Sequence, residues 1–68
     1  MTVLYYNYNG VPAKIHLDDH ETPDSCEIYD REAADFIKCD AQTLDVYDSH
    51  ISTLITEDDF LALLDKVR

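Results

Sequence analysis

The side chains best suited to chemistry in this 68-residue chain are three histidines, two cysteines and fifteen carboxylates. His16 and His20 have the spacing of one half of a zinc site, which usually combines two short His or Cys pairs. Cys26 and Cys39 are separated by 12 residues and provide no second close pair. The acidic segment 18–22 lacks the central glycine and the distal glutamate of a calcium-binding loop. We therefore expect no metal centre and no cofactor, and we interpret the segment as a solvated acidic loop.

Nucleophilic catalysis would have to pair one of the cysteines with one of the histidines, and the sequence around them carries no signature of an activated pair. Gly10 is the only glycine and is needed in a turn, so a glycine-rich phosphate loop is absent from the sequence. A chain this short also has little interior for a substrate pocket of ~300 Å³ or more. We therefore expect that the protein is not an enzyme and has no catalytic residues.

The chain is strongly acidic, since fifteen Asp and Glu against five Lys and Arg give a net charge of −10. This balance argues against direct binding to nucleic acid or to an anionic membrane, since Lys and Arg supply the affinity for phosphates. A hydrophobic content of 46% is still sufficient for one folded domain over residues 1–68. The sequence has no apolar run of ~18 residues, so we expect no membrane span, and we expect no signal peptide. With only two cysteines, we expect a reduced cytoplasmic protein, in the host cytoplasm if a phage encodes it.

The first 17 residues predict a β-hairpin, because Asn9-Gly10 is a favoured type I′ turn. Folding there places apolar pairs on one face: Tyr8 with Val11, Tyr6 with Ala13, and Leu4 with Ile15. The other face, called the outer hairpin face, then carries Val3, Tyr5, Asn7 and His16. The alternatives for what covers it are a partner subunit and the C-terminal segment. Pro12 has no N–H to donate, so we expect the second strand to begin at a sheet edge.

Thr22-Pro23 is typical of a helix start and predicts a helix over 23–38. Its buried stripe would be Cys26, Tyr29, Ala33, Phe36 and Ile37. The alternative is a strand over 27–30. Further strands are expected at 44–47 and, more weakly, at 51–55.

A last helix begins after Thr56, with Asp59 in capping-box spacing and an apolar stripe formed by Phe60, Leu63, Leu64 and Val67. The predicted fold class is therefore α+β. It is a small single domain with the hairpin and one or two further strands in a mainly antiparallel sheet, and with two helices packed on one face.

The acids are concentrated after the hairpin, since residues 18–65 contain all fifteen of them and only Arg31 and Lys38 as cations. On a helix over 23–38, the face opposite the core would gather acids around an exposed Ile28. The residues predicted to bind a partner are Asp24, Glu27, Ile28, Asp30, Glu32, Asp35, Asp40, Asp45, Asp48 and, on the outer hairpin face, Tyr5. The alternatives are that the acids serve only solubility and that Ile28 belongs to the core.

A charged surface around an apolar contact residue indicates a protein that binds a basic partner. In size and charge the chain resembles the acidic anti-CRISPR and anti-restriction proteins of phages, a resemblance of composition without a shared motif. It implies a small inhibitor that binds the basic surface of a nucleic-acid-binding protein, with acids that imitate nucleic acid. The alternative is an antitoxin or immunity-type partner without mimicry, or an oligomeric subunit. A homodimer would form through the Val3–Tyr5 face.

Overall fold

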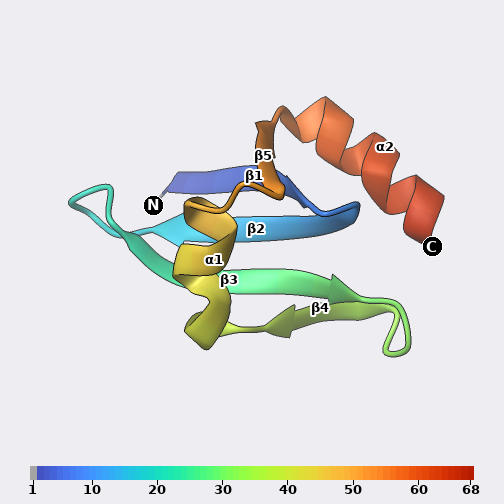
Figure 1. Cartoon of the computed structure of the whole chain (residues 1–68), viewed down its shortest axis with the longest axis horizontal. Helices are drawn as coiled ribbons and strands as arrows, with labels where there is room; N and C mark the ends of the chain where they lie inside the picture. The colour runs from blue at the N-terminus through green and yellow to red at the C-terminus, as the bar shows by residue number, and fades with distance from the viewer. Residues whose placement is uncertain (1) are drawn as a thin grey trace.

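The first two strands form the predicted hairpin. In the computed structural model, which describes residues 2–68, β1 (Thr2–Tyr8) and β2 (Val11–Leu17) pair in antiparallel fashion (Figure 1). The register is the expected one, with Tyr8 opposite Val11 at the turn. Asn9 and Gly10 have φ angles of 52° and 87°, the left-handed values that a type I′ turn requires at both positions.

Residues 23–38 form a second hairpin, so the predicted helix is wrong. β3 (Pro23–Asp30), which contains the alternative strand 27–30, pairs with β2, and β4 (Asp35–Lys38) pairs with β3. Tyr29 and Phe36 are cross-strand partners, and their rings meet edge to face at 5.5 Å. Such aromatic pairs stabilise a sheet directly. In a strand, the three-residue step from Cys26 to Tyr29 that suggested one helix stripe places the two side chains on opposite faces.

The segment after β4 forms two short helical turns where we expected a strand at 44–47. These are the 3₁₀ turn η1 (Asp40–Gln42) and the helix α1 (Thr43–Tyr47). The Thr43 hydroxyl donates a hydrogen bond of 2.8 Å to the carbonyl oxygen of Asp40, which ties the two turns together. Val46 is fully buried against the sheet. In a helix, side chains on one face recur every three to four residues, so a segment this short directs few side chains inward.

The fifth strand, β5 (Ser52–Ile55), pairs with β1 and confirms the strand expected at 51–55. The strand order is β4-β3-β2-β1-β5, and all pairs are antiparallel. β2 is therefore the central strand, and the expectation that it begins at a sheet edge is wrong, although no third strand pairs at Pro12 itself, as its missing N–H predicts. The ladder between β2 and β3 begins at Ala13, so the missing N–H of Pro12 leaves no ladder bond unmade.

The last helix, α2 (Glu57–Val67), has the predicted start. Its N-cap is Thr56, whose side-chain oxygen accepts a hydrogen bond of 3.1 Å from the Asp59 backbone N–H. Phe60 and Leu64 are buried, whereas Leu63 and Val67 are half-buried. Among residues 2–68, no helix is long and apolar enough to cross a membrane.

The two helices pack on opposite faces of the sheet, so the expectation that both lie on one face is wrong. We call the side of the sheet that carries Tyr6, Ala13, Ile15 and Cys26 the α1 face, because these residues cluster with Val46 of α1. The opposite side, the α2 face, carries Tyr5, whose ring lies 4.7 Å from that of Phe60. The C-terminal helix α2 thus packs on the outer hairpin face at Tyr5. The α+β class itself is confirmed.

An apolar groove with an acidic rim

A groove of about 500 Å³ opens on the α1 face. Its apolar lining comes from three strands and the residue after β4, namely Val11, Ile28, Ile37 and Cys39. Ile28 and Ile37 are register partners on β3 and β4, so their side chains lie next to each other. The volume exceeds the ~300 Å³ typical of the smallest ligand sites. The groove is open along the surface of the sheet rather than enclosed, so it does not contradict the expectation that so short a chain has little interior for a pocket.

The groove exists because α1 is too short to cover its face of the sheet. A helix of five residues is only ~7.5 Å long, whereas a strand of eight residues extends over ~26 Å. α1 crosses β2 and β3 at the end where Val46 packs against the core (Figure 1). Ile28, further along β3, stays half-buried, and Ile37 is 41% exposed.

The charged rim of the groove comes from the end of β3 and the β3–β4 turn, which contribute two acids, Asp30 and Glu32, and one base, Arg31. The Asp30 carboxylate accepts hydrogen bonds from the backbone N–H groups of Glu32, at 2.9 Å, and Ala33, at 3.4 Å. These bonds hold the turn and fix the carboxylate at the end of the groove. Asp35 lies opposite Asp30 in the register, so a second acidic residue stands beside this end of the groove.

Gln42 of η1 completes the lining near Cys39. The residues that line the groove include one cysteine and no histidine, so the lining offers apolar contact and carboxylate charge rather than a nucleophile with its base. Among residues 2–68, no three His, Cys, Asp or Glu side chains gather closely enough to hold a metal ion. The arrangement is suited to holding an apolar side chain beside cationic groups.

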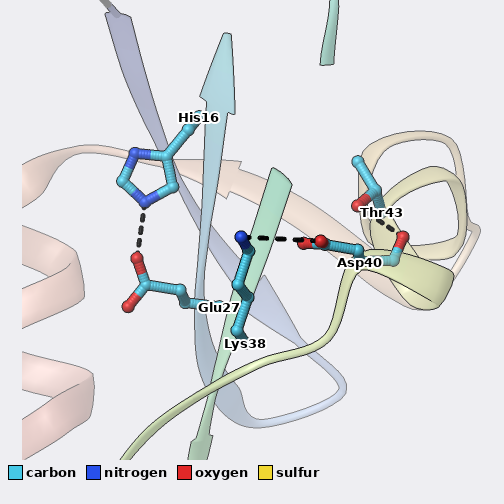
Figure 2. A network of polar contacts seen from close by, with 5 residues as sticks. All are labelled: His16, Glu27, Lys38, Asp40 and Thr43. Carbon is cyan, nitrogen blue, oxygen red and sulfur yellow. Dashed lines mark hydrogen bonds and ion pairs between the residues drawn. The ribbon is translucent and has the colours of Figure 1, made fainter. Parts of the chain in front are cut away.

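A polar network on the other side of the sheet engages Glu27 (Figure 2). His16 Nε2 and Glu27 Oε1 lie 2.7 Å apart on β2 and β3. Next to them Lys38 Nζ lies 3.7 Å from Asp40 Oδ2, and this pair is well exposed. Glu27 is thus held by a neighbouring strand and does not face the groove.

The ten residues predicted to bind a partner are divided among several places. Ile28, Asp30 and Glu32 line the groove, and Asp35 is the register partner of Asp30 but is not part of the lining. Asp24 lies six residues from Asp30 on the same strand, ~20 Å away. Tyr5 and Glu27 face the α2 side. The remaining three acids, Asp40, Asp45 and Asp48, are exposed along η1, α1 and the residue after it.

Four residues of the groove lining are not among those predicted from the sequence to bind a partner, namely Val11, Ile37, Cys39 and Gln42. Helical spacing predicts Ile37 in a buried stripe, and its position opposite Ile28 follows only when residues 23–38 fold as a hairpin. The alternation of apolar residues within each strand was the available signal. Comparison of the chain with protein-family models, with curated proteins and with solved structures finds no match.

Proposed function

We propose that this protein is a small acidic binding protein whose groove receives an apolar side chain from a basic segment of another protein. The observation that carries the proposal is the pairing of Ile28 and Ile37 beneath a rim that contains Asp30 and Glu32. An apolar side chain buried in such a groove supplies affinity, and the surrounding carboxylates favour a partner with Lys or Arg beside that side chain.

The total charge supports the same kind of partner. A charge of −10 on a 68-residue chain creates a strong negative field, which speeds encounter with basic proteins and repels acidic ones. We propose a partner that itself binds nucleic acid, because such proteins carry basic surfaces adapted to dense negative charge. The protein would then act in the cytoplasm as an inhibitor that occupies this surface. An antitoxin or immunity-type partner bound outside the nucleic-acid surface is the alternative.

The test compares two variants with the same change of charge on the same face of the sheet. Ile37→Asp places a carboxylate in the groove, and Leu54→Asp places one on β5 at a position that is 59% exposed and outside the groove lining. Tagged wild-type protein and both variants are used to capture partners from native cell extract at low salt, and the affinity for each captured protein is then measured. We expect Ile37→Asp to weaken binding tenfold or more, about the cost of losing a central contact, and Leu54→Asp to change it little.

The proposal fails if the two variants bind equally well, or if both lose binding to the same extent. Circular dichroism melting of each variant checks that a lost interaction does not reflect an unfolded chain. A second measurement adds duplex DNA or RNA to the complex. Displacement supports mimicry of nucleic acid, whereas a complex that survives the competitor supports the alternative partner.

A further inference from the structure

The two cysteines lie opposite each other on neighbouring segments of the chain. Glu27 and Lys38 are register partners in the β3–β4 ladder, and counting one residue outward along both strands reaches Cys26 and Cys39. The Cys39 backbone N–H donates a hydrogen bond of 2.8 Å to the Cys26 carbonyl oxygen. In a hydrogen-bonded antiparallel pair the two Cα atoms are ~5.5 Å apart, within the ~4.4–6.8 Å that a disulfide spans.

Both side chains lie on the α1 face. Cys26 is fully buried in the cluster that contains Ile15 and Val46, and Cys39 lines the groove together with Ile28. Cys39 is only half-buried, so a small oxidant can reach it from the groove while Cys26 is shielded. Both cysteines are free thiols in this structure.

We propose that Cys26 and Cys39 form a reversible cross-strand disulfide when the protein meets a small-molecule disulfide such as glutathione disulfide. The Cys39 thiolate attacks one sulfur of the oxidant, breaks its S–S bond and releases one glutathione, which takes up a proton. Cys26 then gives up its proton and attacks Cys39 Sγ of the mixed disulfide, which forms the Cys26–Cys39 bond and releases the second glutathione. Two protein thiols are oxidised, and one glutathione disulfide is reduced to two thiols.

The burial of Cys26 fits this order of steps. Burial raises the pKa of the Cys26 thiol to about 11, with smaller contributions from Cys39, Asp40 and Glu27. Because the thiolate is the attacking species, Cys26 is a poor first nucleophile and acts as the resolving thiol. The finished bond would tie the start of η1 to β3 and fix the wall of the groove that Cys39 provides.

The test treats the full chain with glutathione disulfide in mildly alkaline buffer and measures its intact mass after the free thiols are blocked. For the wild type we expect a monomer that has lost the mass of two hydrogen atoms, a change reversed by a reductant. Its melting temperature should rise on the order of 10 °C, and exchange of the Cys39 amide hydrogen should slow. Cys26→Ala should instead keep one glutathione on Cys39, and Cys39→Ser should form no intramolecular bond.

The wild-type measurement decides the matter even if a variant does not fold. A wild-type protein that stays unmodified, that keeps a stable glutathione adduct, or that forms only disulfide-linked dimers would overturn the proposal. These readouts do not depend on any binding partner, so their outcome is independent of the function proposed for the groove.

Discussion

The substitution Phe60→Leu tests whether α2 is fastened to the sheet by its aromatic contacts. Phe60 is 4% exposed, and its ring centroid lies 4.7 Å from that of Tyr5 and 5.8 Å from that of Phe36. Leucine retains apolar contact but loses both ring pairs, each worth ~0.5–1.5 kcal/mol beyond the area buried. We therefore expect the free energy of unfolding to fall by about 1–3 kcal/mol. This is a large share of the ~3–10 kcal/mol expected for 68 residues.

Urea unfolding followed by far-ultraviolet circular dichroism measures this loss. The matched control is Leu61→Ala on the same helix, where the side chain is 49% exposed and the expected loss is below ~1 kcal/mol. If the two substitutions lowered the free energy of unfolding equally, Phe60 would not be the main contact between α2 and the sheet. The claim that the aromatic contacts fasten α2 to the sheet would then be refuted.

Three further predictions concern the turn, the helix start and the buried thiol. Gly10→Ala should lower the free energy of unfolding by about 1 kcal/mol, because Gly10 has a φ of 87°, which alanine adopts at a cost. The added Cβ meets no atom within 4 Å, so the loss reflects the backbone alone. An unchanged urea midpoint would contradict the type I′ turn. Thr56→Ala should cost about 1 kcal/mol by removing the cap on the Asp59 N–H, and Thr56→Ser, measured in parallel, should restore most of it. Burial raises the pKa of Cys26 from 9.0 to about 11, so the folded chain holds this proton more tightly than the unfolded chain. The stabilisation from this raised pKa is fully present below pH 9 and is lost as the pH rises to about 11. In urea titrations, we expect the free energy of unfolding to fall by on the order of 2 kcal/mol over this range. In Cys26→Ala the alkaline loss should be smaller, and an equal loss would contradict the burial of the thiol.

The parts of the fold that the sequence predicted correctly are those determined by neighbouring residues. The hairpin register follows from Asn9-Gly10, and the start of α2 follows from Thr56, since both signals act within a few residues. Residues 23–38 satisfied helical spacing by coincidence. What decides their structure is the contact of Tyr29 with Phe36 and the turn that Asp30 holds, which are visible only once the chain is folded back.

The residues of the groove could be predicted only in part, because some of them are neighbours in the sequence and others meet only after the chain folds back. Ile28 was identified as an apolar residue among acids, and the structure places it with Asp30 and Glu32 in the groove lining. Its neighbour Ile37 comes from the returning strand, so no local pattern reveals it. A helix over 23–38 predicts Glu27 on the same face as these acids, but strand alternation directs its side chain to His16 on the opposite side of the sheet.

The most direct test of the proposed function is a titration of ¹⁵N-labelled protein with the captured partner, followed by two-dimensional NMR of the backbone amides. The groove predicts that the largest shift changes occur at Val11, Ile28, Ile37 and Gln42, together with the rim residues Asp30 and Glu32. Changes centred instead on the α2 face, around His16 and Lys38, would contradict the groove as the binding site.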